Sequence, residues 1–177
     1  MPCPVWLNKC QAKNIENDSQ KGVRNHRNLK FFFRFLTVLL GLNLVWEIGQ
    51  LPFYTLWNNG DWRQIVYAVA HCTAGDTLIA IICTMAVLAF TGWHWSMSGR
   101  PNVYFLGIFI VFGVTYTIFS EWLNTTVRMT WSYSDLMPVL PLLGTGVAPL
   151  LQWIAVPSLA FWLCSPATKT PYTSAKH

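Results

Sequence analysis

Four long apolar runs constrain this chain more than any other feature of its sequence. They cover residues 31–57, 65–92, 104–123 and 137–163, and each reaches the roughly 20 residues that a helix needs to cross a hydrocarbon core of about 30 Å. Only 11% of the residues are charged, which is less than half of the roughly 25% typical of soluble domains. The sequence therefore predicts an all-α membrane protein, built as a bundle of four transmembrane helices.

The segments outside these runs are short and polar. Residues 1–30 form a basic N-terminal segment without an apolar run, and residues 164–177 form a short tail. The first apolar run is too long for the apolar region of a signal peptide and is followed by further spans, so we expect it to remain as a membrane helix. Connectors at 58–61 and 98–101 contain Asn, Gly, Ser and Pro, which are typical turn formers.

Lys and Arg are distributed unevenly between the two sides of the predicted membrane. Only Arg63 and Arg128 fall on one side. The other ten basic residues fall on the opposite side: Lys9, Lys13, Lys21, Arg24, Arg27, Lys30, Arg34, Arg100, Lys169 and Lys176. This asymmetry predicts that both termini are cytoplasmic. The net charge of +5 then reports membrane topology, with a further attraction to anionic membrane lipids, and does not indicate nucleic-acid binding.

Polar residues form a stripe along the first span. Asn43, Glu47, Gln50 and Tyr54 lie on one face of a helix with 3.6 residues per turn. An acidic residue at the centre of a membrane helix costs about 2.5–3.5 kcal/mol on insertion scales, so the stripe must face protein or water. The amides also suit a hydrogen-bonding seam between helices, whereas Glu47 favours a functional role. Pro52 is expected to free a backbone carbonyl near Glu47.

The second and third spans add further ionisable side chains. Asp76 lies near the predicted midplane, and His71 lies closer to the outer surface. Positions five apart diverge by about 140° around a helix, so these two side chains would flank the inner face unless Gly75 permits a kink. Glu121 lies toward the outer end of the third span, within reach of interfacial water.

The fourth span is rich in helix-breaking residues. Residues 137–149 contain three prolines and two glycines, which predicts a kinked or broken helix whose freed backbone groups line a cavity or meet neighbouring side chains. Thr145 and Gln152 share one face and would complete a polar lining. Trp153 lies inside the span, where its side chain either packs against a neighbouring helix or forms the wall of a site. The alternative is a kinked helix that packs closely through its small residues.

These residues predict an intramembrane site in the outer half of the bundle. Buried carboxyl and imidazole groups have altered protonation and can transfer protons. We expect Asp76 and Glu47 to act as proton donor and acceptor, His71 as a relay and Glu121 as a further catalytic residue. The predicted substrate-binding residues are Asn43, Gln50, Tyr54, Thr145, Gln152 and Trp153.

Motifs for other chemistry are missing from the sequence. We find no nucleotide-binding, nucleophile-elbow or Cys-x-x-Cys pattern, and no metal-ligand spacing such as His-x-x-x-His. The sequence therefore predicts no metal and identifies no cofactor. The five cysteines are expected to be free thiols.

The last two spans resemble the emopamil-binding sterol-isomerase family of four-helix membrane proteins. The likeness consists of an acidic residue beside an aromatic, Glu121-Trp122, and a later Pro-Leu-x-x-Trp, which runs from Pro149 to Trp153. It covers less than a third of the chain, and the spacing between its two elements differs from that of the family. The resemblance implies isomerisation of a lipid double bond by proton transfer.

Three functions fit these observations. The first is a membrane-embedded enzyme that performs acid–base chemistry on a lipophilic small molecule. The second is an accessory subunit whose polar stripes pair with the helices of a larger membrane complex. The third is a proton- or cation-coupled carrier, formed as a homo-oligomer because four helices enclose only a small pore. Membrane lipids are expected partners in each case.

Overall fold

A computed structural model describes residues 5–91 and 103–165, where the regular structure is helical apart from two isolated antiparallel bridges. The element order is α1 (Val5–Gln50), η1 (Leu51–Phe53), α2 (Leu56–Asn59), α3 (Trp62–Thr91), α4 (Val103–Trp122), the π-helical turn η3 (Leu123–Val127) and α5 (Val147–Cys164). Four stretches are long and apolar enough to cross a membrane: Leu29–Phe53, Trp62–Val87, Val103–Val127 and Val147–Cys164. The predicted all-α fold with four such helices is confirmed, and it suits a multi-pass integral membrane protein.

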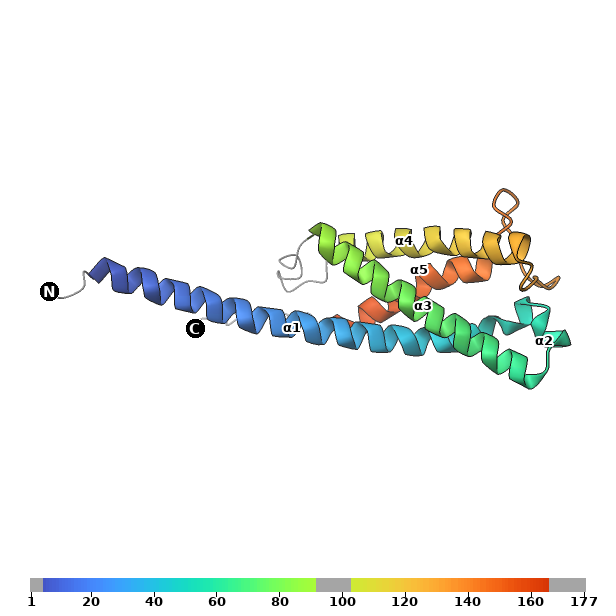
Figure 1. Ribbon diagram of the computed structural model, residues 1–177, viewed down its shortest axis with the longest axis horizontal. Coiled ribbons are helices and arrows are strands. Elements are labelled where there is room, and N and C mark those ends of the chain that lie inside the picture. Colours follow the sequence, from blue (N-terminus) through green and yellow to red (C-terminus); the bar gives the residue numbers. More distant parts are fainter. Residues whose placement is uncertain (1–4, 92–102, 166–177) are drawn as a thin grey trace, which may run out of the picture.

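The four spanning helices form a bundle (Figure 1). Helix α1 contacts α3 and α5, while α4 contacts α5 and α3. The N-terminal part of α1, dark blue in Figure 1, extends well beyond the other helices without a break. Helix α3 crosses the bundle diagonally, so that its N-terminal end diverges from α4.

One half of the bundle is filled by apolar side chains, and we call it the closed half. Phe35 and Phe109 are fully buried there, with ring centroids 5.7 Å apart in an edge-to-face arrangement, which is a favourable geometry for aromatic pairs. The closed half also contains Phe32, Leu39, Ala80, Cys83, Val87, Phe105, Val156, Ala160, Phe161 and Cys164. The other half, which contains the C-terminal ends of α1 and α4, is called the cavity half.

The connection between α1 and α3 follows from local sequence. Pro52 cannot continue an α-helix, and α1 ends at Gln50, followed by the single 3-10 turn η1. Tyr54 therefore lies beyond the helix that the sequence analysis assigned to it. Asp61 then caps α3, since its Oδ1 accepts hydrogen bonds from the amides of Arg63 and Gln64 at 2.7 and 2.9 Å. The Gln64 side chain accepts from the Asp61 amide in return, at 3.0 Å.

The fourth helix differs from its prediction. It begins at Val147 rather than Met137, and the preceding residues form a loop closed by a bridge between Val139 and Gly146. Gly144 has a φ of +62° in this loop, a conformation that glycine adopts easily. The first two prolines of the segment therefore lie outside the helix, and Pro149 lies in its first turn, where the missing N–H is tolerated. Among the described residues of α5, Pro157 is the proline inside the helix.

Candidate functional site

The polar stripe of α1 faces the interior of the bundle. Asn43, Glu47 and Gln50 are 3%, 6% and 6% exposed, and their spacing of four and three residues puts them on one face. The indole nitrogen of Trp46 donates to Gln50 Oε1 at 3.2 Å, and the Gln50 side chain lies beside Glu47. The stripe is thus held by contacts along the helix as well as across the bundle.

A single amide joins three of the spanning helices. Nε2 of Gln152, on α5, lies 3.2 Å from Asn43 Oδ1 and 3.1 Å from Glu47 Oε1 on α1, and 2.7 Å from Asp76 Oδ2 on α3. A carboxamide nitrogen has only two hydrogens, so these three acceptors share them. Gln152 therefore brings Glu47 and Asp76 to one point.

The two carboxyl groups at this point are also close to each other, since both accept from the same Gln152 nitrogen. Glu47 and Asp76 interact through their side chains, although an ionised carboxylate has no proton to donate. A hydrogen bond between two carboxyl groups requires a proton on one of them. Two carboxyl groups in this arrangement can share a proton, which either residue can then release or receive.

A third carboxyl group lies on the opposite wall. Glu121, on α4, is 7% exposed and accepts a hydrogen bond from the hydroxyl of Tyr133. The same hydroxyl accepts a hydrogen bond from the amide of Gly146 at 2.9 Å. Gly146 is the N-cap residue of α5. The indole of Trp131 lies beside Glu121, but its nitrogen lacks hydrogen-bond geometry to a partner among the described residues.

A short strap, which we define as residues 130–135, crosses the end of the cavity half. The Ser132 carbonyl accepts from the Thr55 amide at 3.1 Å, and the Ser134 amide donates to the Phe53 carbonyl at 2.9 Å. The Ser134 hydroxyl donates to the Pro52 carbonyl at 2.9 Å. These bonds attach the strap to the segment that follows α1.

Two tyrosines meet where the strap joins that segment. Tyr54 and Tyr133 form an antiparallel bridge, with ring centroids 5.6 Å apart. Burial raises the pKa of the Tyr54 hydroxyl well above its usual range, and the neighbouring Glu121 carboxyl adds to the effect. Burial and the hydrogen bond to Glu121 raise the pKa of Tyr133 as well. Both hydroxyls therefore keep their protons at neutral pH and are available as hydrogen-bond donors.

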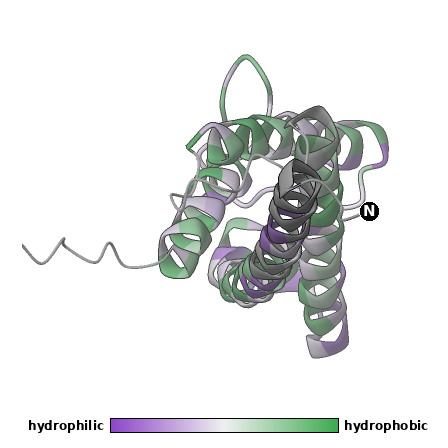
Figure 2. Ribbon diagram, turned by 90° about the vertical axis from the view of Figure 1, so that its left-hand side faces the viewer, coloured by the Kyte–Doolittle hydropathy of each residue, from purple (hydrophilic) through white to green (hydrophobic). Residues whose placement is uncertain are grey.

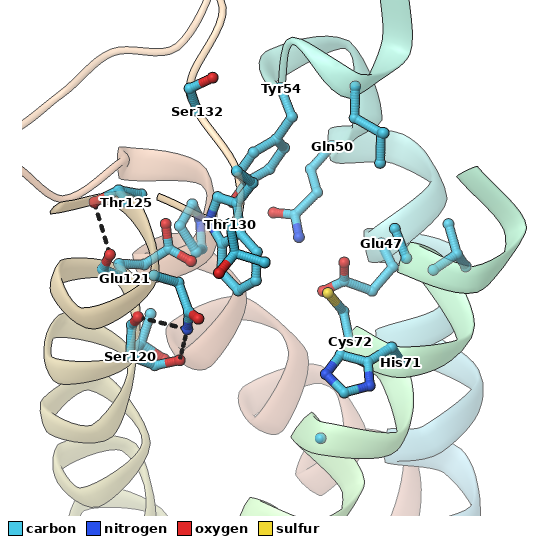
Figure 3. Close-up of a pocket in the computed structure, with 18 of the residues that line it drawn as sticks. Glu47, Gln50, Tyr54, His71, Cys72, Ser120, Glu121, Thr125, Thr130 and Ser132 are labelled. Carbon is cyan, nitrogen blue, oxygen red and sulfur yellow. Dashed lines mark hydrogen bonds between the residues drawn. The ribbon is translucent and has the colours of Figure 1, made fainter. Parts of the chain in front are cut away.

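These groups surround a cavity of about 1030 Å³. Figure 3 shows side chains from α1 and α3 on one side of it and side chains from α4 on the other. The wall includes exposed aromatic rings from both α3 and α4, namely Tyr67, Tyr116 and Phe119. Part of the cavity wall is therefore apolar and exposed on the side where α3 diverges from α4.

Trp153 separates the cavity from the closed half. Its ring is 3% exposed, lines the cavity and packs on Phe109, with centroids 6.0 Å apart. It also covers Gly113 of α4 so closely that a Cβ at this glycine would lie 2.0 Å from Trp153 Cε3. Only glycine leaves room for this contact.

The structure brings most of the predicted site residues together, but not all of them. Of the predicted residues, Glu47, Gln50, Tyr54, Asp76, Glu121, Gln152 and Trp153 line the cavity. Asn43 lies behind them and bonds to Gln152. Thr145 is fully buried in the loop before α5, donates to the Leu143 carbonyl at 3.3 Å, and is not part of the cavity wall.

His71 lies at the edge of the site. Its ring is exposed, lines the cavity and stacks on Tyr67, with centroids 5.5 Å apart and planes 14° apart. Helix α3 runs without interruption through Gly75, so no break in the helix brings His71 closer to Asp76.

Sequence reasoning missed the residues of the strap. Tyr133 and Trp131 fall in a connector between two apolar runs, where helical periodicity gives no information. The concentration of aromatic and hydroxyl residues in 130–134 is the signal that could have indicated them. Cys72 was assigned only as a free thiol, and it lines the cavity next to Glu47 and Asp76.

The side chains in the described ranges contain no group of three or more His, Cys, Asp or Glu residues placed to hold a metal ion. The site instead combines carboxyl, amide, phenol and thiol groups in the wall of one cavity. In comparisons with known proteins, no family model, curated protein or solved structure matches this chain.

Proposed function

We propose that this protein binds a lipophilic molecule in the cavity and performs acid–base chemistry on it. One observation carries the proposal: carboxyl groups from two separate helices meet at the Gln152 amide, in the wall of a cavity that also carries exposed aromatic rings. Ionisable residues inside a membrane protein are costly and generally functional. Here Glu47 and Asp76 act as proton acceptor and donor, and Glu121 serves the opposite face of the substrate.

The reaction class that suits this pair is proton transfer to and from carbon, as in the migration of a double bond. One carboxyl group gives its proton to one carbon atom, and a carboxylate takes a proton from another carbon atom of the same molecule. No redox partner is needed, because the two proton transfers balance. Gln152 holds both carboxyl groups in position, and we assign no proton-transfer step to His71, whose exposed ring stacks on Tyr67.

The packing of the rest of the bundle favours this function over a carrier. A carrier needs access to its site from both sides of the membrane. The closed half is filled by aromatic rings, including the fully buried Phe35, Phe105 and Phe109. The cavity reaches only the other half, which supports a binding pocket rather than a passage.

The partners of the polar stripe favour an enzyme over an accessory subunit. An accessory subunit would offer its stripe to a helix of another chain. Asn43, Glu47 and Gln152 are buried and bonded to one another within this chain. With the distribution of Lys and Arg, we further propose that both termini are cytoplasmic and that the cavity half faces away from the cytoplasm.

Deuterium exchange tests the proposed chemistry without knowledge of the substrate. The purified protein is reconstituted in vesicles made from lipids of the expression host and incubated in heavy water. The lipids are then extracted, returned to ordinary water to remove deuterium from O–H and N–H groups, and analysed by mass spectrometry. We expect carbon-bound deuterium in one lipid class, because a proton placed on carbon during the reaction comes from the solvent.

The matched variants are Glu47→Gln and Asp76→Asn, which keep side-chain size and hydrogen bonding but remove the acids. We expect both to lose the deuterium incorporation, while Gly107→Ala retains it, since a Cβ at Gly107 meets no other atom within 4 Å. Incorporation that is equal in the wild type and in both acid variants, or that is absent from the wild type, contradicts the proposal.

A further inference from the structure

The segment before α5 is apolar and yet lies outside any helix. We call residues 136–146 the apolar loop, because they contain no charged residue and six Leu, Val or Met side chains. Leu142 is 98% exposed and Leu136 is 66% exposed. Val139, Leu140 and Leu143 are also partly exposed, at 43%, 37% and 45%. The apolar residues that suggested a longer fourth span therefore lie in an exposed loop and not in a helix.

The apolar loop extends sideways from the bundle. In Figure 1 it is the orange loop that rises above α4, perpendicular to the long axis of the bundle and level with the last turns of that helix. Figure 2 shows the same loop projecting from the bundle in a second view, coloured mostly as hydrophobic. If the helices cross a membrane along the long axis of the bundle, a loop that projects perpendicular to this axis runs parallel to the membrane plane and does not extend further into water.

Tryptophans mark the level at which the apolar loop leaves the bundle. Trp122, the last residue of α4, is 48% exposed, and Trp57 and Trp62 at the same end of the bundle are 49% and 70% exposed. Exposed tryptophans are typical of the zone between lipid headgroups and acyl chains. The apolar loop therefore begins in this zone.

Part of the backbone of the apolar loop is paired within the loop itself. The Leu140 amide donates to the Thr145 carbonyl at 3.0 Å, and the Gly144 amide donates to the Leu140 carbonyl at 2.9 Å. The Val147 amide closes the base of the loop on the Pro138 carbonyl at 2.8 Å. Prolines at 138 and 141 have no amide hydrogen. Internal pairing of this kind lowers the cost of taking a backbone out of water.

We infer that the apolar loop inserts into the membrane leaflet at the cavity end and anchors this end of the bundle in lipid. The acyl chains of that leaflet contact the exposed side chains of the apolar loop. Lipid suits a surface with exposed leucines, no charge and a partly paired backbone, which lies beside membrane-spanning helices. This inference depends on the position of the chain in a membrane and not on the proposed chemistry.

The anchor is connected directly to the cavity. Gly146 closes the loop through its bridge to Val139, and its amide donates to the hydroxyl of Tyr133. That hydroxyl in turn donates to Glu121. Lipid that holds the loop in place therefore also holds Tyr133 against the carboxyl group in the cavity wall, which makes Tyr133 a positioning residue.

Fluorescence quenching tests the location of the loop. A fluorescent noncanonical amino acid is placed at position 142, where the side chain contacts little else, and the protein is reconstituted in phosphatidylcholine vesicles. Brominated acyl chains quench a probe in the lipid, and iodide quenches a probe in water. We expect strong quenching by the brominated lipid and little by iodide. The same probe at position 58, on the exposed α2, should show the reverse.

Each other outcome overturns the inference. Quenching by iodide at position 142 would place the loop in water, and protection from both quenchers would mean that protein covers it, as in contact with a second copy. Leu142→Asp provides a second measurement. A charge is costly in lipid, so we expect this variant to raise quenching by iodide of a probe at position 140, whereas Asn58→Asp leaves it unchanged. No response to Leu142→Asp would contradict the insertion.

Discussion

The closed half and the cavity half of the bundle are built from the same helices but bury opposite kinds of side chain. The closed half buries apolar side chains, and the cavity half buries polar ones. In the closed half, Phe35 and Phe109 pack edge to face and are fully buried. In the cavity half, α1 buries Glu47 and α5 buries Gln152 instead. Burying a polar group without a partner costs about 2–7 kcal/mol, and Glu47 and Gln152 avoid this cost because they bond to each other. The apolar packing of the closed half holds the helices together next to this polar cavity.

This contrast explains why the site occupies only one end. Lipid is as apolar as leucine, so packing and hydrogen bonds, rather than the hydrophobic effect, hold membrane helices together. The helices are joined by ring packing in the closed half and by the Gln152 amide and the strap in the cavity half. Substitutions in the two halves should consequently have different consequences.

The largest effect on stability is expected from Phe109→Ala in the closed half. Removing a buried phenylalanine typically costs about 3–5 kcal/mol, and lipid cannot fill the space that it leaves at the centre of the bundle. The measurement is thermal unfolding in detergent, followed by the reaction of the buried Cys83 and Cys164 thiols with a fluorogenic maleimide. Phe112→Ala, on the exposed face of the same helix, is the control and should unfold like the wild type.

The next effect is expected at the boundary between the halves. Gly113→Ala introduces a Cβ at 2.0 Å from the Trp153 ring, and overpacking of this kind costs about 1–3 kcal/mol. Because Trp153 also lines the cavity, the change should lower both the unfolding temperature and the deuterium incorporation. Gly107→Ala changes the same residue type in the same helix without a clash. If both variants unfold at the same temperature, the packing of α4 on α5 is not as described.

A smaller effect is expected from Tyr133→Phe in the cavity half. The substitution removes the hydroxyl that joins Glu121 to Gly146, and the loss of such a bond costs about 0.5–3 kcal/mol. A double-mutant cycle with Glu121→Gln, measured by unfolding in detergent, isolates the interaction between the two side chains. Additive effects of the two substitutions would mean that Tyr133 and Glu121 do not act as a pair.

The smallest effect is expected from His71→Ala. The exposed ring contacts Tyr67, and substitutions at exposed positions usually change stability by less than about 0.5 kcal/mol. Deuterium incorporation should also survive. Loss of incorporation in this variant alone would restore His71 as a proton relay and would require a different route for the proton.

The sequence predicted the helices well and the connections poorly. Hydropathy identifies a span from its length, so the four helices could be located before the structure was known. The face of α1 that carries Glu47 followed from helical periodicity. The shared position of Glu47, Asp76 and Gln152 depends on how three helices pack, which periodicity within one helix does not contain.

The apolar loop shows where hydropathy misleads. Residues 137–146 are uncharged and rich in Leu, but two prolines and Gly144 at a positive φ favour a turn. The mean hydropathy of a segment indicates whether the segment prefers lipid. It does not indicate whether the segment is a helix. Thr145 was assigned to the site for this reason, since its position was counted along a helix that begins only at Val147.

Infrared spectroscopy of the carboxyl groups tests the central claim most directly, namely that Glu47 and Asp76 share one proton in a single site. We expect the wild type at neutral pH to show a band from a protonated carboxyl group, and we expect Glu47→Gln and Asp76→Asn each to shift or remove that same band. Phe112→Ala should leave it unchanged. If no such band exists, or if it responds to only one of the two acid substitutions, the two carboxyl groups are independent and the account is contradicted.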